Sequence, residues 1–349
     1  MKADSAAGRI QSVDTFRVIA IFAVILIHTE PYSGAATPSG LPYLGVVINQ
    51  LARFSVPYFF IISGFFWGSK LTNSSQLEES TNRTIRRILI IFIAWSIIYL
   101  MPTTYFNWQK IESIDAASIL LNKLKYLSRS PWVAMLEGTR EHLWFLSSLI
   151  SCLVISTIFI RLQLQRSLII LAIVLYTIGL AGKAYTDTPL GFHSNFNYRD
   201  GPFFGLLFFI TGYLLNQKKP ASSWLFLGIT VTIIGFLVHF LELFVLQHYW
   251  KTSMYQDYVF GTYFSGLGVA LIALSGSPSL RLPGLSSLGP LVLGIYVVHI
   301  MFIDLLGPVK ELIPIGSMRE LGFPLIVFIF SAVTVSALSF GRLTRKIVA

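Results

Sequence analysis

The chain has 349 residues, of which 54% are hydrophobic and 12% are charged, about half the charged fraction of a soluble globular protein. Together with a mean hydropathy of +0.69, this composition excludes an ordinary soluble domain and indicates a polytopic membrane protein. The net charge of +10 is spread over short segments between apolar runs, which indicates membrane topology and not nucleic-acid binding. The single cysteine, Cys152, excludes an intrachain disulfide and a multi-thiolate metal site.

The apolar runs predict an all-α fold of about ten transmembrane helices, in a single integral membrane domain over residues 1–349. Residues 1–15 lack the charged start, apolar core and cleavage site of a signal peptide, so we expect the first apolar run to be retained. Segment 108–130 is amphipathic and predicts a surface helix, and segment 184–200 predicts a polar loop. The predicted membrane helices cover 13–33, 43–67, 85–105, 143–162, 166–183, 201–217, 222–247, 257–276, 285–306 and 321–342.

Lysine and arginine residues predict the orientation, because they accumulate in the cytoplasmic loops of membrane proteins. With the N-terminus in the cytoplasm, the inner segments carry basic groups such as Arg83, Arg86, Arg87 and Arg345, while the longer outer loops mix both signs of charge. Both termini then face inward. We therefore expect a multi-pass protein of the cell inner (cytoplasmic) membrane, with the lipid bilayer and not nucleic acid as its partner.

Arg17 and His28 occur in the first apolar run, in the stretch FRVIAIFAVILIHTEPY. Their spacing of 11 residues corresponds to about 1100° of helical rotation, or roughly 20° after full turns, so both side chains share one helix face. The rise is about 16 Å, which puts Arg17 at the cytoplasmic rim and His28 beyond the midplane. Asp14 shares the face of Arg17 and is expected to orient its guanidinium. Glu30 is about 200° from His28 and points elsewhere, unless Pro31 breaks the helix.

The second predicted helix carries a charge within the hydrocarbon region. Arg53 lies about ten residues from its outer end, and a buried arginine usually faces a cavity or a partner because its burial costs at least a few kcal/mol. We therefore expect a function for Arg53. Pro57, Ser63 and Gly64 are explained by a kink and by close helix packing.

Arg83, Arg86 and Arg87 open the third predicted helix in the sequence RTIRR. Arg83 and Arg86 are one helical turn apart, and Arg87 shares the face of Arg83. Alone, such a cluster is an ordinary topology signal. Beside Arg17 it becomes a candidate phosphate clamp, because the planar guanidinium matches phosphate oxygens.

The histidines all fall in the outer half or the outer loops of this topology. Each one is individually explained by a satisfied polar contact, but together with Arg53 they predict a polar cavity that opens to the outside. Glu242 and Asp304 are acidic neighbours of two of them in sequence. The zinc-binding spacings H-x-x-x-H and H-E-x-x-H do not occur, so we expect no metal. The histidines are His28, His142, His193, His239, His248 and His299.

These features together resemble the acyltransferase-3 family of integral membrane O-acyltransferases. Their order and spacing fit the family along nearly the whole chain, as does the expected number of helices. The sequence contains no fused extracellular hydrolase-like domain of the kind that some members carry, so it resembles the stand-alone form. The matching features are Arg17 with His28, VPYFFIISGFF at 56–66, Arg83 with Arg86, HLWFL at 142–146 and GIYVVH at 294–299.

The resemblance implies transfer of an acyl group, most often acetyl, to a hydroxyl of a cell-envelope glycan or lipid-linked saccharide. It also implies cytoplasmic acetyl-CoA as the acyl donor and an acceptor on the outer side of the inner membrane. The family's essential pair maps onto Arg17 and His28. Its R-x-x-R motif maps onto Arg83 and Arg86.

The expected positions of Arg17 and His28 along the first helix suggest a hypothesis for the mechanism of acyl transfer. The pantetheine arm of CoA has a reach comparable to the separation of about 16 Å along the first helix, so the thioester meets His28, which serves as general base or as acyl carrier. Arg53 stabilises the oxyanion or orients the donor, and Cys152 and Ser63 are weaker candidates for an acyl carrier. The residues expected to bind CoA are Arg17, Arg83, Arg86 and Arg87. Those expected to bind the acceptor are Glu30, His142, His239, Glu242, His299 and Asp304.

Two rival interpretations belong to other functional classes. A transporter or flippase of a lipid-linked glycan also needs buried charge near the midplane, but it predicts substrate movement without acyl chemistry. A non-catalytic partner of an assembly complex uses Arg17 as a topology anchor and His28 as an interhelical hydrogen bonder, so both residues are replaceable. The identity of the acceptor, the acyl group and the oligomeric state, including a homo-oligomer, are left open.

Overall fold

The computed structural model describes residues 10–33, 43–70, 74–101, 116–218, 220–314 and 316–348 of the chain. In these residues every regular element is a helix, as the all-α prediction requires. The predicted loop at 184–200 is described throughout and contains no helix, while the amphipathic segment at 108–130 contains the helix Ala116–Arg129. Residues 102–115, at the start of that segment, and residues 1–9 lie outside the described part.

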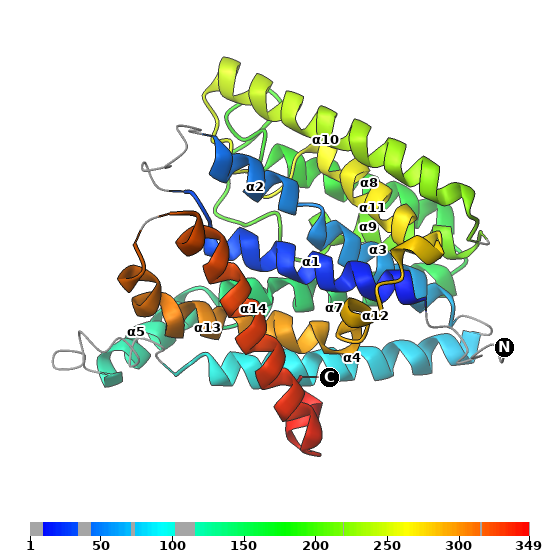
Figure 1. The fold of residues 1–349 in the computed structure, drawn as a ribbon. Helices are drawn as coiled ribbons and strands as arrows, with labels where there is room; N and C mark the ends of the chain where they lie inside the picture. Colours follow the sequence, from blue (N-terminus) through cyan, green and yellow to red (C-terminus); the bar gives the residue numbers. More distant parts are fainter. Residues whose placement is uncertain are drawn as a thin grey trace.

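The helices lie side by side in one bundle (Figure 1). In chain order they are α1 (Gln11–Thr29), α2 (Leu44–Ala52), α3 (Ser55–Gly68), α4 (Ser74–Ile98), α5 (Ala116–Arg129), α6 (Pro131–Leu136), α7 (Trp144–Arg161), α8 (Gln165–Ala181), α9 (Pro202–Asn216), α10 (Ser223–Trp250), α11 (Phe260–Leu274), α12 (Pro283–Ser286), α13 (Val292–Leu312) and α14 (Ser317–Phe340). Short 3₁₀ helices are η3 (Glu141–Leu143), η4 (Pro278–Leu280), η5 (Gly289–Leu291) and η6 (Thr344–Ile347).

Within the described ranges, 6 helical segments are long and apolar enough to cross a membrane. The helices α8, α9 and α11 are also apolar but shorter. These segments are those of a multi-pass membrane protein. The count of ten spanning helices and the inward orientation of both termini stay predictions. The long segments are Gln11–Thr29, Leu44–Gly68, Glu141–Arg161, Ser223–Trp250, Pro283–Leu312 and Met318–Phe340.

The second predicted helix is divided into α2 and α3. Arg53 and Phe54 form a turn between them, in which the Arg53 amide donates to the Gln50 carbonyl. Pro57 lies in the first turn of α3, where its missing N–H leaves no helical hydrogen bond unmade. The proline therefore helps to start α3, and it does not kink a continuous helix. The division places the Arg53 side chain at a helix junction.

The third predicted helix is longer at its start than the apolar pattern indicates. α4 begins at Ser74 and ends at Ile98, whereas the apolar run predicts a helix over 85–105. The additional first turns read SSQLEESTNR and are polar, so hydropathy alone does not reveal them. These turns place Arg83 outside the bundle, where its side chain is 78% exposed.

α1 lies in the middle of the bundle in Figure 1, and it contacts α2, α3, α11, α13 and α14. Its side chains Val13, Ile21 and Ile25 are fully buried. α10 lies at the margin in the same view and exposes large apolar side chains, of which Phe226 is 78% exposed. Such side chains face lipid in a membrane protein. Polar groups on α1 therefore lie inside protein and not against lipid.

Close approach of α3 and α9 depends on glycines, as expected for the Ser63-Gly64 pair. A Cβ atom on Gly64 would lie 1.9 Å from the carbonyl oxygen of Phe209, and one on Gly212 would lie 1.8 Å from that of Ile61. Any larger residue at either position would force the two backbones apart. The packing interpretation of Gly64 is confirmed, and this contact holds α3 and its neighbour Arg53 in place.

Candidate active site

Arg17 and His28 lie near opposite ends of α1 and line two different cavities. His28 lines a cavity of about 240 Å³, here named the histidine cavity. Arg17 lines a cavity of about 660 Å³, here named the arginine cavity. Val24 of α1 and Val56 of α3 line both, so the two cavities approach each other between the ends of α1. The ionisable side chains that line the histidine cavity are His28, Glu30, Arg53, Glu141, Arg199 and Asp257, with Tyr258 beside them.

Glu30 lines the histidine cavity beside His28, although a regular helix would point it elsewhere. α1 ends at Thr29, and Glu30 adopts a left-handed backbone with φ 45° and ψ 58°. This conformation is uncommon for a residue other than glycine, and it turns the chain sharply before Pro31. The helix break that Pro31 permits is therefore present, and it brings a carboxylate to the cavity that holds the imidazole.

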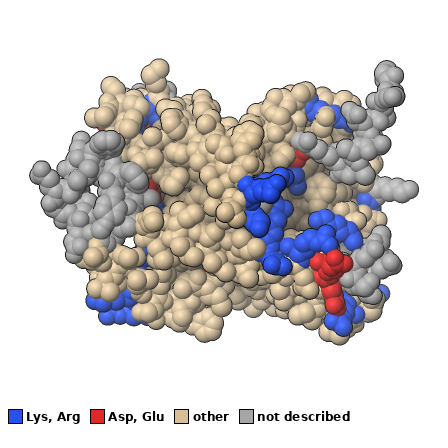
Figure 2. All heavy atoms as spheres, turned by 90° about the horizontal axis from the view of Figure 1, so that it is seen from below, with Lys and Arg blue, Asp and Glu red and all other residues tan. Residues whose placement is uncertain are grey.

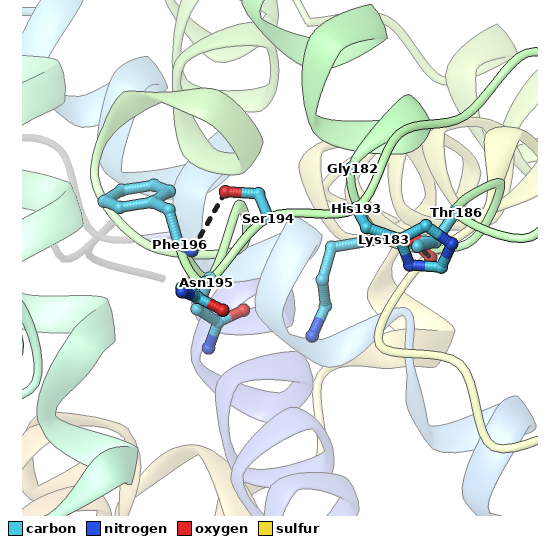
Figure 3. A pocket seen from close by; sticks show the side chains of 8 residues that line it. Gly182, Lys183, Thr186, His193, Ser194, Asn195 and Phe196 are labelled. Carbon is cyan, nitrogen blue, oxygen red and sulfur yellow. Dashed lines mark hydrogen bonds between the residues drawn. The ribbon is translucent and has the colours of Figure 1, made fainter.

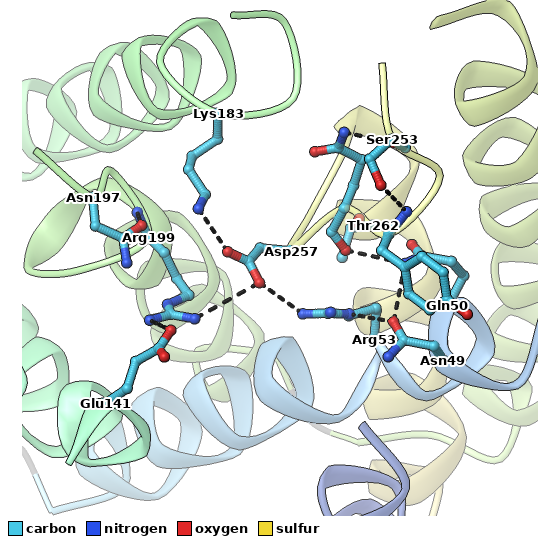
Figure 4. Close-up of polar contacts among 12 residues, drawn as sticks. Asn49, Gln50, Arg53, Glu141, Lys183, Asn197, Arg199, Ser253, Asp257 and Thr262 are labelled. Atoms are coloured by element: carbon cyan, nitrogen blue, oxygen red, sulfur yellow. Dashed lines mark hydrogen bonds and ion pairs between the residues drawn. The ribbon is translucent and has the colours of Figure 1, made fainter. Parts of the chain in front are cut away.

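Asp257 connects three cations at the wall of the histidine cavity (Figure 4). Its carboxylate accepts from Arg53 Nη1 at 2.9 Å and from Lys183 Nζ at 2.8 Å, and Arg199 Nη1 lies 3.7 Å away. Burial alone raises the pKa of Asp257, but the charges of Arg199, Arg53 and Lys183 hold it well below its usual range. Asp257 is therefore ionised and fixes the Arg53 guanidinium, whose Nε also donates to Asn49 at 3.1 Å.

Arg199 is the second centre of this network. Its Nη2 donates to Glu141 at 2.9 Å, and its guanidinium lies 4.9 Å from the ring centroid of Trp144. Burial lowers the pKa of Arg199, but the carboxylates of Asp257, Asp200 and Glu141 raise it above its ordinary value. Arg199 therefore stays charged, and it ties the loop before α9 to the start of α7.

Asp200 differs from the other carboxyl groups of the network. Its residue is buried, and burial together with a hydrogen bond to Glu137 raises the pKa of Asp200 to about 8. The charge of Arg199 opposes this increase without cancelling it. Asp200 thus holds a proton near neutral pH in a loop that adjoins the cavity.

His28 belongs to a cluster of histidine rings drawn from α1, α13 and η3. The ring centroids of His28 and His299 are 5.2 Å apart, and those of His299 and His142 are 5.4 Å apart. His28 is exposed and lines the histidine cavity, whereas His299 and His142 are buried and line neither cavity in the described part of the chain. The sequence predicts His28 as the catalytic residue and both His142 and His299 at the acceptor, but the structure places these two behind His28.

Three other predicted acceptor residues lie away from both cavities, as far as the described residues show. His239 is held between Gln50 Oε1 at 3.0 Å and Thr262 Oγ1 at 3.1 Å. Glu242 accepts from the backbone amides that begin α11, at 2.8 and 2.9 Å, and from the Tyr185 hydroxyl. Asp304 pairs with Arg140. These contacts are structural, and the geometry gives no support for an acceptor-binding role.

The arginine cavity contains guanidinium groups from three elements. Arg17 comes from α1, Arg87 from α4 and Arg345 from η6. Arg17 Nη1 donates to Asp14 Oδ1 at 2.9 Å, which confirms the predicted pairing, and its guanidinium lies 5.2 Å from the ring centroid of Phe66. Ser63 also lines this cavity, while Cys152 is fully buried in the core.

The other two arginines of RTIRR point away from this cavity. Arg83 forms an exposed ion pair with Glu79 at 2.6 Å, and Arg86 is also exposed. Neither side chain lines the arginine cavity. η6 supplies Arg345 to the arginine cavity in their place. It is held against α4 because Trp95 Nε1 donates to the Ile347 carbonyl at 2.7 Å. Figure 2 shows Lys and Arg side chains gathered in the right-hand half of one face, the half in which Figure 1 shows α4 beginning.

An open pocket of about 600 Å³ lies in the loop between α8 and α9 (Figure 3). Lys183, Thr186 and His193 line one part of it, and Ser194 to Asn197 line the other. Lys183 also donates to Asp257, so this loop pocket adjoins the network at the histidine cavity. No group of three or more His, Cys, Asp or Glu side chains in the described residues is arranged to hold a metal ion.

Sequence reasoning missed several residues of the site, which are Glu141, Lys183, Arg199, Asp257 and Arg345. The loop residues come from segments far apart in the chain, and no spacing rule connects them. The available signal was a charged residue three positions before the start of an apolar helix, as Arg199 stands before α9 and Asp257 before α11.

Comparisons with known proteins bear on the identity of the chain. A family model described as an acyltransferase domain matches residues 10–341. The curated relatives include an "Amino-acid racemase" of Enterococcus faecalis, 27% identical over 337 residues, which cover 91% of this chain and 44% of that protein. A "Serine/alanine racemase" of Enterococcus gallinarum is 27% identical over 243 residues, which cover 65% of this chain and 32% of that protein. No solved structure matches the chain.

The chain spans less than half the length of these relatives, so their names describe proteins that it resembles only in part. The family model, by contrast, covers nearly the whole chain, including the helix that carries Arg17 and His28, the residues that line the histidine cavity, and those that line the arginine cavity apart from Arg345. The chain belongs to the acyltransferase-3 family.

Proposed function

We propose that the protein transfers an acyl group, acetyl in the first instance, from cytoplasmic acetyl-CoA to a hydroxyl of a cell-envelope glycan or lipid-linked saccharide outside the inner membrane. The observation that carries this proposal is the pair of cavities that α1 connects. One contains arginines, the other contains an accessible imidazole, and Val24 and Val56 line both. A donor with an anionic head and a reactive tail fits such a pair.

The arginine cavity has the properties that a CoA site requires. Its guanidinium groups, from Arg17, Arg87 and Arg345, suit phosphate oxygens, which planar guanidinium groups bind in a bidentate manner. Its remaining wall includes apolar side chains such as Leu146 and Leu149, against which a pantetheine arm packs. The thioester then reaches Val24, one helical turn from His28.

The histidine cavity has the properties of the reacting end. The acceptor hydroxyl oxygen attacks the thioester carbonyl carbon, the new C–O ester bond forms, and the C–S bond breaks. His28 takes the hydroxyl proton as general base and returns it to the departing CoA sulfur. The second route, a covalent acyl group on His28, uses the same residues in two steps.

Arg53 is the residue best placed to stabilise the oxyanion. Its guanidinium lines the cavity and is fixed by Asp257 and Asn49, so no reorganisation is needed when negative charge develops. The acceptor saccharide extends from the cavity toward the loop that carries Lys183 and Arg199. The pocket in Figure 3 offers room for it beside Lys183.

The test is acetyl-CoA turnover by the purified protein in nanodiscs, with free CoA as the readout and lipid-linked saccharides as acceptors. Wild type is compared with His28→Ala and Arg17→Ala. We expect turnover by wild type, loss in His28→Ala with CoA binding retained, and weaker CoA binding in Arg17→Ala. CoA binding is measured separately as a shift in thermal unfolding, because a ligand of the folded state raises its stability.

Failure of CoA to bind the wild type would count against acyl transfer and for the rival, a transporter or flippase of a lipid-linked glycan. That rival shares the buried charges around Asp257, which membrane transporters also place near the midplane. A proteoliposome assay of saccharide movement without acyl donor then decides between the two.

A further inference from the structure

The buried histidine behind His28 has one ring nitrogen whose state the structure fixes. His299 Nδ1 lies 2.6 Å from the carbonyl oxygen of Tyr296 on the same helix. A carbonyl oxygen only accepts hydrogen bonds, so Nδ1 carries the proton and Nε2 carries a lone pair. That Nε2 atom is fully buried and has no hydrogen-bond partner among the described residues.

Of the rings that contact His299, one can donate a hydrogen bond to this lone pair. The rings that contact His299 are those of His28, His142 and Tyr296. The Tyr296 hydroxyl already donates to the His142 carbonyl. His142 forms a hydrogen bond to the backbone of Val297, and its Nε2 atom has no partner in the described chain. The bond is therefore made by Nδ1, which donates its proton to the Val297 carbonyl, so His142 has no N–H left for His299. His28 is the contacting ring whose N–H is not otherwise engaged within the described structure.

We infer that His299 is a positioning residue, which accepts an N–H of His28 at its Nε2 atom and thereby holds His28 in one tautomer. The centroid separation of 5.2 Å allows a nitrogen of each ring to reach such a bond when the His28 ring rotates to face His299. The other nitrogen of His28 is then left with a lone pair on the side of the histidine cavity.

This arrangement gives His28 the orientation that a general base needs. An imidazole alternates between two tautomers, and only the one with a lone pair toward the acceptor hydroxyl takes its proton. In many hydrolases a carboxylate selects the tautomer. Here a neutral imidazole does so, and its own orientation is fixed by the carbonyl of Tyr296. The kinetic consequence rests on the proposed acyl transfer, whereas the tautomer itself does not.

Two amide substitutions separate the two nitrogens of His299. A glutamine amide reaches the position of Nε2, whereas an asparagine amide occupies the position of Nδ1. His299→Gln therefore retains an acceptor near His28, and His299→Asn retains only the contact to Tyr296. Both variants are neutral and polar, so neither places a charge in the buried site, and thermal unfolding of each variant reports its loss of packing.

We expect His299→Asn to lower kcat by about tenfold or more with an unchanged KM for acetyl-CoA, and His299→Gln to stay within about threefold of wild type. Equal kcat values for the two variants, or a change confined to KM, would overturn the inference. Purely structural packing by His299 predicts losses that follow the thermal destabilisation of each variant and no change in the His28 tautomer.

A second readout does not depend on turnover. NMR of isotope-labelled histidine in nanodisc-embedded protein reports the tautomer of each ring, and the His28 signal is assigned by its loss in His28→Gln. We expect a single neutral tautomer of His28 in wild type and in His299→Gln, and a mixture in His299→Asn. A mixture already present in wild type would refute the role of His299. A single tautomer with no acyl transfer would refute only the proposed function.

Discussion

Val24 of α1 and Val56 of α3 line both the arginine cavity and the histidine cavity. Among the described residues, this pair of aliphatic side chains is therefore all that the two cavities share. In the proposed reaction, the reactive end of the donor passes between these residues. The size of these two side chains therefore determines the width of the passage between the cavities.

Enlarging Val56 is expected to block transfer without removing the donor site. Val56→Phe fills the junction, so we expect turnover to fall by about tenfold or more while the CoA-induced thermal shift is retained. Val56→Ala is the matched variant that keeps the passage open. Normal turnover in Val56→Phe would show that the donor does not cross at this point.

Arg345 is expected to bind a CoA phosphate, although its place in the sequence indicates only topology. Arg345→Ala should weaken CoA binding by about tenfold, or ~1.4 kcal/mol, because a guanidinium–phosphate contact is lost. The control is Arg342→Ala, which removes a nearby exposed arginine that does not line the cavity. Arg83→Ala should also have little effect, since Arg83 faces Glu79. Equal dissociation constants for all three variants would contradict the assignment.

Asp257→Asn is expected to destabilise the folded protein. The substitution removes the negative charge that connects Arg53, Lys183 and Arg199, and removing one partner from a largely buried ion pair costs on the order of 3 kcal/mol. We therefore expect a lower temperature of thermal unfolding in detergent. An Asp257→Asn protein as stable as wild type would mean that solvent screens these three cations.

Asp200 is expected to make stability fall as the pH rises. Its pKa is about 8 in the folded protein and about 3.8 ordinarily, so the folded state binds more protons between these values. The stabilisation is complete below pH 4 and is lost progressively as the pH approaches 8. Thermal unfolding measured from pH 5 to about 8 should show this slope. Asp200→Asn should flatten it, while Asp187→Asn, an exposed change in the same loop, should not.

Relationships within a single helix were predictable from the sequence. The turn of the α-helix relates Arg17 to Asp14 without any tertiary information, and the ion pair at 2.9 Å confirms that prediction. The same rule correctly placed Arg17 and His28 along one helix at separate levels. It failed for Glu30, because α1 ends one residue earlier at Thr29.

Relationships between segments were not predictable. Asp257, Arg199 and Lys183 come from loops that only the packed bundle brings together, and a lone charge in a loop has no periodicity. The arginines of the RTIRR sequence show the same limit, because two side chains about one turn apart on the same face of α4 have different surroundings. Arg87 and Arg83 are four residues apart, yet only Arg87 lines the cavity.

The contact between Trp95 and the Ile347 carbonyl holds η6 against α4, and Val348 is buried directly after it. The Val348 amide donates to the Arg345 carbonyl at 3.3 Å, so residue 348 lies close to a residue that lines the arginine cavity. In the proposed reaction, a purification tag or fluorescent protein fused after residue 348 would compete with the donor for space. Reporter fusions of this protein should therefore carry their labels elsewhere, and a fusion at this point that slows turnover would itself map the entrance of the proposed donor site.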